Sequence, residues 1–415
     1  MPPNSIAILH YTAPPIIGGV EAVIEAHVKL FIQAGFQVKV IAGRGQSQAI
    51  TSPAQFISIP EIDSQNTQII KMNSVLEQGS VPPEFDGVVE NISRHLTPVL
   101  SEVEHVIIHN IFTKHFNLAL TAALHQLIDQ GVIKHAVAWC HDFTWTSPHS
   151  RSKVHPGIPW ELLRTYREDV DYVVVSKQRQ DTLAQLFSCP PENIRVIYNG
   201  VDPQEMLGLS DKGMALIERL DLLDSDLNLL MPVRVTQAKN IELALHLVSA
   251  LKSRKINPKL VLTGPPDPHD SQSMQYYRSL RDLRKQLGVE EEMRFVFESG
   301  LDPARPNYID IRTVGDLLRI SDVIFMPSLR EGFGMPVLEA GLAGILVVST
   351  EIPASVEIGS PDVFIFDAAT HPNVLAEQIM DLVESNPISR LRRRMRKSYT
   401  WNAIFRRQID PLLRV

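Results

Sequence analysis

The chain has 415 residues, of which 44% are hydrophobic and 21% are charged, and its formal net charge is −7. This length suggests two domains of about 200 residues each, and the composition is that of a soluble globular protein. The negative charge gives no overall attraction to nucleic acid or to an anionic membrane surface.

The cysteine content and the N-terminal sequence indicate the cellular compartment. Two cysteines, Cys140 and Cys189, are too few for a disulfide framework and favour a reducing cytoplasm. No apolar run reaches the ~18 residues that span a bilayer. The N-terminal sequence Met-Pro-Pro-Asn-Ser lacks the charged and apolar regions of a signal peptide. We therefore expect a cytoplasmic protein without membrane association.

In the first half of the chain, apolar strand candidates alternate with helical stretches, which is typical of a doubly wound α/β sheet. A helix is expected over residues 20–34, between the first two strands, with Gly35 as its C-cap. The expected strands are residues 6–10, 38–42, 56–59, 106–109, 136–141, 172–176 and 194–197.

The polar, turn-rich residues 198–203 predict a hinge, and residues 388–413 predict one or two terminal helices. We expect an N-terminal domain over 1–198, a C-terminal domain over 199–395, and a final helix over 396–415 that crosses back to the first domain. The strands expected in the second half are residues 227–232, 259–263, 294–297, 323–326, 346–349 and 363–366.

This organisation predicts an α/β protein with two Rossmann-like, doubly wound domains that face a cleft. In such folds ligands bind outside the carboxyl ends of the strands. The loops that follow the expected strands are therefore the candidate functional segments.

The loop after the first strand carries Gly18 and Gly19 directly before a helix. Two glycines there allow a phosphate or a sugar to approach the backbone closely. A tight strand-to-helix turn that needs glycine for steric reasons explains the pair equally well.

The loop after residues 136–141 carries His141 and Asp142. A histidine at the end of an apolar strand can reach a ligand, and its acidic neighbour favours a functional role over a structural one. Trp139, Phe143 and Trp145 belong either to the core or to a surface that stacks on a sugar.

Two basic residues, Arg234 and Lys239, follow a strand and precede an amphipathic helix. Together they suit the two phosphates of a diphosphate and the charge on a departing diphosphate, although isolated basic residues usually lie solvated on the surface. Gly264, in a tight turn after the next strand, is a candidate border of a nucleotide site.

The most informative segment runs from Glu331 to Glu339. It follows an apolar strand, turns through Gly332 and Gly334, and enters a helix at Pro336. A strand, a glycine turn and a helix N-terminus together form an anion site. Because carboxylates would repel a diphosphate, Glu331 and Glu339 are better suited to accept hydrogen bonds from hydroxyl groups. A ligand with phosphates between hydroxyl-bearing ends is a nucleotide sugar.

Several other chemistries find no support. The chain has no P-loop, no Gly-x-Ser-x-Gly elbow and no dinucleotide fingerprint. Its histidines lack zinc-type pairing, and the Asp-x-Asp triplets at 169–171 and 224–226 are interpreted as structural, so no metal site is predicted. The basic run 390–397 is interpreted as a solvated helix face, with an acidic partner as the alternative.

The chain resembles the GT-B glycosyltransferases of the large retaining family 4 over nearly its whole length. The resemblance is carried by Glu331-Gly-Phe-Gly-Met-Pro-Val-Leu-Glu339, Arg234, Lys239, Gly18-Gly19, His141-Asp142, Asn199-Gly-Val-Asp202 and Tyr399-Thr-Trp401. One difference is that the family's phosphate loop usually begins Gly-Arg, whereas this chain has Pro232-Val-Arg234.

The resemblance implies a role for each matching residue. Catalysis would involve His141, which contacts the donor sugar, and Glu331, which binds its hydroxyl groups. Arg234 and Lys239 would stabilise the leaving diphosphate without a metal, and Glu339 would bind the ribose. The residues that would border the donor are Gly18, Gly19, Gly264, Gly332, Phe333, Gly334 and Met335.

The implied activity is the transfer of a hexose, with retention, from a nucleotide-diphosphate sugar of the UDP-glucose or GDP-mannose type to a hydroxyl acceptor, with no cofactor. A phosphorylase or an epimerase of the same fold, or a non-catalytic nucleotide-sugar binder, remains an alternative. The acceptor is expected to be small and soluble or acidic. The candidate acceptor residues are Asp142, Trp145, Arg151 and Lys153, where a mobile polar loop is the alternative.

Overall fold

A computed structural model of the protein describes residues 5–267, 272–302 and 305–414. The chain divides into two compact units, Met1–Gly200 together with Ile404–Val415, and Val201–Ala403. Residues 1–4, which belong to the stretch considered for a signal peptide, lie outside the described residues. Within the described part of the chain, no helix has both the length and the apolar character needed to cross a membrane.

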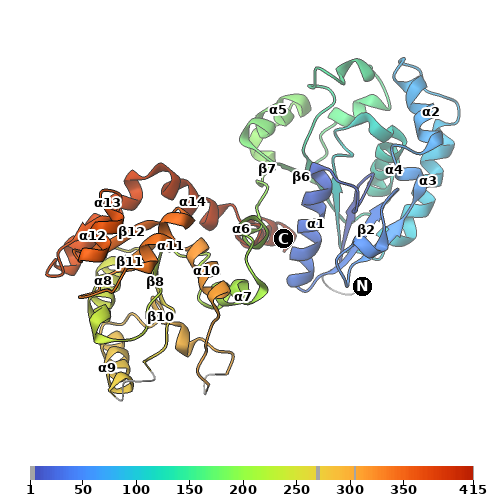
Figure 1. The fold of residues 1–415 in the computed structure, drawn as a ribbon. Helices are drawn as coiled ribbons and strands as arrows, with labels where there is room; N and C mark the ends of the chain where they lie inside the picture. The colour runs from blue at the N-terminus through green and yellow to red at the C-terminus, as the bar shows by residue number, and fades with distance from the viewer. Residues whose placement is uncertain (1–4, 268–271, 303–304, 415) are drawn as a thin grey trace. The chain divides into compact units, whose positions relative to one another are not determined.

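The first unit is built on a seven-stranded parallel sheet (Figure 1). Its strand order is β3-β2-β1-β4-β5-β6-β7, so the chain moves outward to one edge, returns to the centre and then continues to the other edge. The strands are β1 (Ser5–Leu9), β2 (Gln37–Ala42), β3 (Gln55–Ser58), β4 (His105–His109), β5 (His135–Cys140), β6 (Val170–Val174) and β7 (Ile194–Val196).

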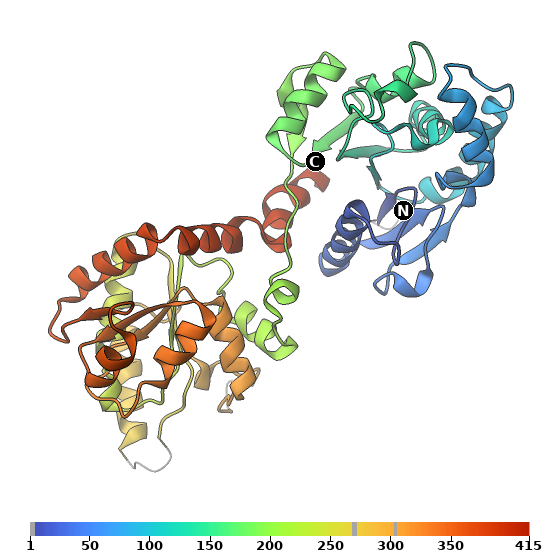
Figure 2. The ribbon, with the colours of Figure 1, turned by 45° about the horizontal axis from the view of Figure 1, so that its top comes forward.

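Helices accompany the strands of the first unit (Figure 2). Alternate residues of a strand point to opposite faces; Ala7 and Leu9 of β1 pack in one core with helix residues such as Ile92 and Leu124. The helices are α1 (Gly19–Gln33), α2 (Thr67–Leu76), α3 (Phe85–Leu100), α4 (Leu118–Asp129) and α5 (Lys177–Phe187). The terminal segments of this unit are α15 (Trp401–Ile404), which straddles the division, a π-helical turn (Phe405–Ile409) and α16 (Asp410–Leu413).

The second unit contains a six-stranded parallel sheet of order β10-β9-β8-β11-β12-β13. When its strands are counted from β8, this order is the same as that of the first six strands of the first unit. Both sheets therefore have the strand order of dinucleotide-binding folds, with a point where the order reverses. The strands are β8 (Leu227–Met231), β9 (Pro258–Leu262), β10 (Met293–Phe295), β11 (Val323–Met326), β12 (Leu346–Thr350) and β13 (Phe364–Phe366).

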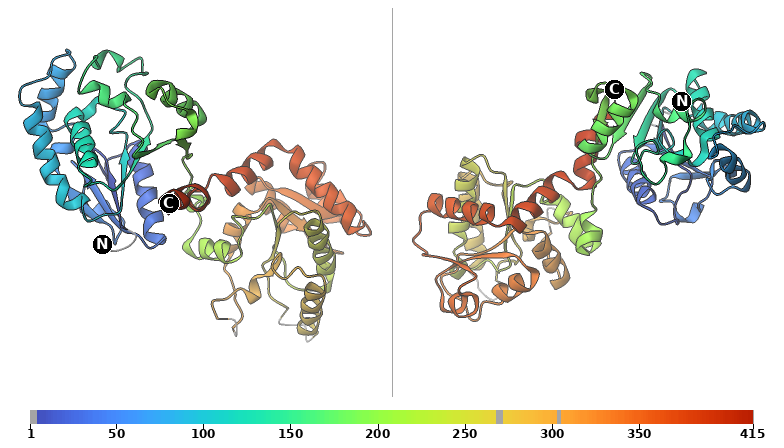
Figure 3. Two further views of the ribbon diagram at one scale, coloured as in Figure 1. Left: turned by 180° about the vertical axis from the view of Figure 1, so that it is seen from behind. Right: turned by 90° about the horizontal axis from the view of Figure 1, so that it is seen from above.

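Two apolar clusters pack on the second sheet, which is seen from two further directions in Figure 3. Leu229 of β8 belongs to a cluster with residues of α8, α9 and α13, and its neighbour Leu230 belongs to one with residues of α7, α10 and α11. The helices are α6 (Pro203–Leu207), α7 (Asp211–Arg219), α8 (Ile241–Ser253), α9 (Ser273–Gln286), α10 (Ile311–Ile320), α11 (Met335–Ala343), α12 (Pro353–Gly359), α13 (Pro372–Ser385) and α14 (Pro387–Ser398).

The predicted fold class of two doubly wound α/β domains is confirmed. Each expected strand is present and agrees with the structure to within two residues at either end. Buried parallel strands are nearly continuous apolar runs, which explains this agreement. The expected helix at residues 20–34 is α1, and Gly35 follows it with a φ of +85°.

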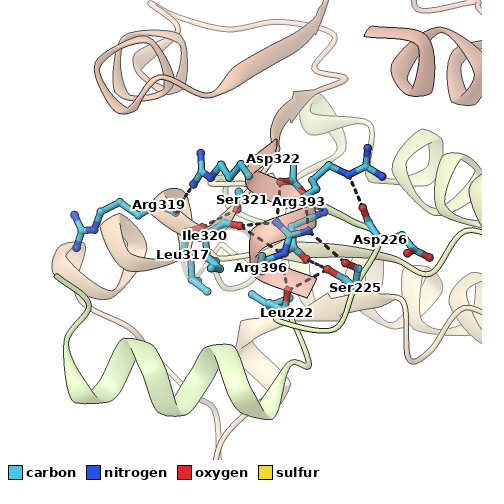
Figure 4. Close-up of polar contacts among 12 residues, drawn as sticks. Leu222, Ser225, Asp226, Leu317, Arg319, Ile320, Ser321, Asp322, Arg393 and Arg396 are labelled. Atoms are coloured by element: carbon cyan, nitrogen blue, oxygen red, sulfur yellow. Dashed lines mark hydrogen bonds and ion pairs between the residues drawn. The ribbon is translucent and has the colours of Figure 1, made fainter. Parts of the chain in front are cut away.

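The interpretation of residues 390–397 as a solvated helix face holds for Arg390 and Arg394, which are exposed, but is wrong for Arg393 and Arg396 (Figure 4). Arg396 of α14 is only 6% exposed and binds both carboxylate oxygens of Asp322, at 2.7 and 2.8 Å. Arg393 donates to the backbone oxygen of Asp226 at 2.7 Å, and Lys397 pairs with the Asp226 carboxylate. The acidic partners of this basic run therefore lie within the second unit itself.

Candidate active site

The residues expected to bind the donor lie on two loops of the second unit. One loop follows β8 and the other follows β11, and these strands are neighbours at the point where the strand order reverses. The backbone N–H of Leu329 donates to the oxygen of Ala238 at 2.8 Å and ties the two loops together. The fold thus brings residues that are about ninety positions apart in sequence to one place.

Lys239 and Glu331 form a direct ion pair at this place. The Lys239 Nζ atom lies 2.6 Å from Glu331 Oε1, and the same oxygen accepts a hydrogen bond from Ser328 Oγ at 2.6 Å. The side chains of Lys239 and Glu331 are 19% and 11% exposed. Partial burial strengthens the attraction between such charges, and the two hydrogen bonds fix the carboxylate in one direction.

Arg234 and Gly264 lie side by side at the same edge of the sheet. The Arg234 side chain is 59% exposed, and its Nη1 atom lies 3.9 Å from Asp267 Oδ1. A Cβ atom on Gly264 would lie 2.4 Å from the Val233 oxygen and 2.8 Å from the Arg234 Cα. Glycine at position 264 therefore lets the two loops pack together and supports the backbone that carries Arg234.

The start of helix α11 completes this part of the site. Gly334 precedes the helix with a φ of +84°, a conformation that other residues rarely adopt. A cavity of about 410 Å³ is bordered by this turn and by both charged loops. Its lining residues are Pro232, Val233, Arg234, Thr236, Lys239, Glu331, Phe333, Gly334, Met335 and Pro336. A helix N-terminus and two cations favour an anionic group at this position.

Gly332 and Glu339 lie next to this cavity in sequence. Gly332 is exposed in the loop, and nothing lies within 4 Å of the position that a Cβ would take. Glu339 is half-buried on α11, four residues after Met335. The two carboxylates of the motif thus lie on either side of the glycine turn, Glu331 before it and Glu339 on α11.

In the first unit, His141 follows β5 and lies in a cluster of buried histidines. The Nε2 atom of His141 lies 3.2 Å from the Nδ1 atom of His109, at the end of β4. His10, after β1, faces the backbone oxygen of His109 through its own Nδ1 at 2.9 Å. His27 of α1 packs against the ring of Trp139 with a centroid distance of 4.5 Å. This cluster occupies the reversal point of the first sheet.

Burial keeps these imidazoles neutral. Desolvation lowers the pKa of His141 to about 4, with His10 adding to the effect and Asp142 opposing it. Desolvation also lowers the pKa of His27 to about 3 and holds that of His109 well below its usual value. Near neutral pH the cluster therefore offers hydrogen-bonding groups without charge.

Gly18 and Gly19 lie in the first unit, where α1 begins. The carboxylate of Glu21 folds over this turn, accepts a hydrogen bond from Thr12 Oγ1, and lies 4.0 Å from His10 Nε2. A Cβ on Gly18 would lie 2.2 Å from Glu21 Oε2, whereas the space around Gly19 is open. Close packing of Glu21 explains the glycine at position 18, and Gly19 leaves the backbone accessible.

The four expected acceptor residues are distributed over the first unit. Asp142 pairs with Arg179 at 3.0 Å. The ring of Trp145 packs against the guanidinium of Arg164, and its N–H donates to the Trp160 oxygen at 3.2 Å. These contacts make Trp145 part of the packing of its loop.

Arg151 and Lys153 lie on a short 3₁₀ turn (Arg151–Lys153). Arg151 is exposed, whereas Lys153 Nζ donates to Glu77 Oε1 at 2.9 Å. Trp139 and Phe143, considered for sugar stacking, are 0% and 1% exposed and belong to the core.

A second cavity, of about 520 Å³, lies in the first unit beside Lys153. The aromatic ring of Phe116, 40% exposed, forms one part of its wall. Its lining residues are Ser64, Gln65, Ile70, Asn73, Ser74, Glu77, His115, Phe116 and Lys153. The Nδ1 atom of His115 lies 3.0 Å from Oγ1 of Thr144. Thr144 follows His141 by three residues in the sequence. The cavity therefore combines polar side chains with one part-exposed aromatic ring.

His10, His109 and their contacts with His141 were not predicted from the sequence. The signal was present, since three expected strands, at residues 6–10, 106–109 and 136–141, each end in histidine. Their adjacency depends on the order β1-β4-β5, which the sequence alone did not reveal. Among the described residues, no group of three or more His, Cys, Asp or Glu side chains is arranged to hold a metal ion.

Each half of the chain matches a family model of glycosyltransferases. Residues 17–205 match the family described as Glycosyltransferase Family 4, and residues 217–400 match Glycosyl transferases group 1. The expectation of a glycosyltransferase is confirmed at this level.

The curated relatives include a protein named as a glycosyltransferase and one named as a synthase. An uncharacterized glycosyltransferase of Methanocaldococcus jannaschii is 30% identical over 200 residues, which is 48% of this chain and 46% of the relative. Mannosylglucosylglycerate synthase of Petrotoga mobilis is 25% identical over 355 residues, 80% of this chain and 77% of the relative. The crystal structure of a Rickettsia africae glycosyltransferase shares 17% identity, with a TM-score of 0.37 over 99% of this chain and 97% of that one.

Proposed function

We propose that the protein transfers a hexose, with retention and without a metal, from a nucleotide-diphosphate sugar of the UDP-glucose or GDP-mannose type to a hydroxyl acceptor. The observation that carries this proposal is the Lys239–Glu331 pair, 2.6 Å apart, in a cavity that also includes Arg234 and the start of α11. A cation beside a carboxylate suits a ligand whose phosphates adjoin hydroxyl groups.

In this proposal the phosphates of the donor lie against Arg234, Lys239 and the N-terminus of α11. Backbone N–H groups between Phe333 and Met335 donate to phosphate or sugar oxygens. Glu331, already fixed by two donors, accepts hydrogen bonds from the sugar. Glu339 accepts them from the ribose.

The proposed reaction breaks the bond between the anomeric carbon and the phosphate oxygen, and the electron pair leaves with the nucleoside diphosphate. Arg234 and Lys239 stabilise the negative charge that develops on this leaving group, which is why no metal is invoked. The acceptor oxygen attacks the anomeric carbon from the face that the phosphate leaves. Its proton passes to the departing phosphate oxygen, so the anomeric configuration is retained. His141 contacts the donor sugar in this scheme.

We propose that the acceptor binds in the first unit, in the cavity beside Lys153. Glu77 accepts hydrogen bonds there, Lys153 donates them, and Phe116 offers an apolar face to the carbon side of a sugar or polyol. Because Lys153 is paired with Glu77 at 2.9 Å, this cavity suits a small hydroxyl-rich acceptor better than a highly charged one. The name of the Petrotoga mobilis relative, with its sugar and glycerate parts, is compatible with such an acceptor.

The test is a screen of UDP- and GDP-sugars for nucleotide release in the presence of EDTA, with polyols and simple sugars as acceptors. We expect at least one donor to be turned over, and the product to have the anomeric configuration of the donor sugar when examined by NMR. Binding of a donor without release of nucleotide would favour the non-catalytic binder. Turnover that requires inorganic phosphate would favour a phosphorylase, and a changed donor sugar without transfer would favour an epimerase.

A further inference from the structure

The buried histidines of the first unit make contacts that bear on how His141 works. His141 is 9% exposed, and the neighbouring strand contributes His109, which is fully buried. Their rings are nearly parallel, with centroids 5.5 Å apart and an interplanar angle of 23°. Nε2 of His141 and Nδ1 of His109 are 3.2 Å apart, so in a hydrogen-bonded pair of neutral rings one of these nitrogens donates and the other accepts.

Asn110 holds the backbone of the same loop. Its φ of +61° places it in the left-handed region, which asparagine tolerates better than most residues. From there its side-chain oxygen accepts hydrogen bonds from the backbone N–H groups of His141 at 2.8 Å and Asp142 at 3.1 Å. Its own N–H donates to the Trp139 oxygen at 2.9 Å. His109 and Asn110, adjacent in sequence, therefore fix both the ring and the backbone of His141.

The surroundings of His109 decide which nitrogen carries the shared proton. Its other nitrogen, Nε2, is buried and has no hydrogen-bond partner within the described parts of the chain. A buried N–H without an acceptor is rarer, and costs more, than a buried lone pair. His109 is thus more stable with its proton on Nδ1, from which it donates to Nε2 of His141. A neutral His141 then carries its own proton on Nδ1.

The other members of the cluster surround this pair of histidines. His10 must carry its proton on Nδ1, because its partner is the His109 carbonyl oxygen, which can only accept. The remaining nitrogen of His10 faces Glu21, with 4.0 Å between His10 Nε2 and Glu21 Oε1. His27 and Asp142 are the other titratable groups that act on His141 or His109.

We propose that His109 and Asn110 are positioning residues that present His141 as a neutral imidazole whose Nδ1–H donates to an oxygen of the substrate. The contact with substrate rests on the proposed glycosyl transfer, whereas the position of the proton does not.

The direct test is ¹⁵N NMR of the full-length protein with labelled histidine rings near neutral pH. The signals of His141 are assigned by their loss in His141→Gln. We expect a protonated Nδ1 and an unprotonated Nε2 for His141. A protonated Nε2 would overturn the proposal, whether or not the protein transfers sugar.

A pair of substitutions at His109 tests the positioning role. His109→Asn places an amide nitrogen where Nδ1 was, whereas His109→Leu removes the donor and keeps an apolar side chain. By analogy with other imidazole-orienting partners, we expect His109→Leu to lower kcat about 10- to 100-fold, with most of the loss recovered in His109→Asn. The KM for the donor should change little. Equal kcat in wild type and His109→Leu, at equal Tm, would contradict the proposal, as would equal losses in both variants.

Asn110 provides an independent pair of variants. Asn110→Asp keeps a side-chain oxygen and tolerates a positive φ, whereas Asn110→Ala does neither. Higher kcat in the aspartate variant than in the alanine variant, with both folded by circular dichroism, would support the role of the oxygen. The reverse order would contradict it. If the wild type transfers no sugar from any donor, the proposed function fails while the NMR result still decides the position of the proton.

Discussion

The two units share a strand order but differ in the chemistry at their reversal points. The second sheet presents a part-exposed lysine, a carboxylate and an arginine beside a helix N-terminus. The first sheet presents buried histidines whose pKa values are lowered by desolvation. The same topology therefore creates a possible ligand-binding position in each unit. The residues at the strand ends make the position in the second unit suitable for phosphate and the position in the first unit suitable for hydrogen bonds with uncharged groups.

An ion pair outside the cavity also stabilises the second unit. The comparison between the two units can therefore be tested by measuring the free energy of unfolding. Arg396→Ala leaves the buried Asp322 carboxylate without its bidentate partner. We expect the free energy of unfolding to fall by ~3–5 kcal/mol, as measured by urea denaturation. The matched control is Arg394→Ala on the same helix, an exposed residue, which should change stability by less than about 0.5 kcal/mol. Equal effects of the two substitutions would contradict the assigned role of Arg396.

The next prediction concerns activity and depends on the charge in the cavity. Lys239→Ala should remove ~2–4 kcal/mol of transition-state stabilisation, equivalent to about 30- to 10³-fold in kcat, because one preorganised cation is lost. Lys252→Ala on α8, where the lysine forms a pair with Glu292 at 2.7 Å, is the control and should leave turnover unchanged. Unchanged turnover in Lys239→Ala would show that the ion pair with Glu331 has no catalytic role.

A further effect is expected from acid, and it should be concentrated in the first unit. The pKa of buried His27 is about 3, below the value of about 6.5 in the unfolded chain, so the unfolded state binds the extra proton. Its contribution to stability is complete above pH 6.5 and is lost as the pH falls toward 3, at about 1.4 kcal/mol per pH unit. His27→Phe should therefore reduce the slope of stability against pH between pH 6 and pH 4.

The control for that measurement is His246→Gln, which changes an exposed histidine of α8. Denaturation curves at several pH values, followed by a probe in the first unit, give the slopes. If His27→Phe and wild type lose stability in parallel, burial of neutral histidines is not what makes the first unit sensitive to acid.

The sequence predicted the parts of this structure that depend on local patterns. Apolar runs identified the strands, and the spacing of Glu331 and Glu339 around glycine marked the start of α11. The contact between His109 and His141 joins residues 32 positions apart, and it depends on which strands are neighbours. Similarly, the partner of Arg396 lies 74 residues away, so the basic run could not be distinguished from a solvated helix face. Features set by neighbouring residues could be predicted from the sequence, whereas contacts between residues far apart in the sequence could be identified only from the structure.

The central claim, that the second unit binds the diphosphate of a nucleotide sugar, is tested most directly by calorimetric titration of the full-length protein with UDP, UMP, GDP and GMP. If Arg234 and Lys239 hold two phosphates, one of the diphosphates should bind with 1:1 stoichiometry and more tightly than its monophosphate. This preference should disappear in Lys239→Ala. Absence of binding by both diphosphates, or equal affinity for a diphosphate and its monophosphate, would contradict the account.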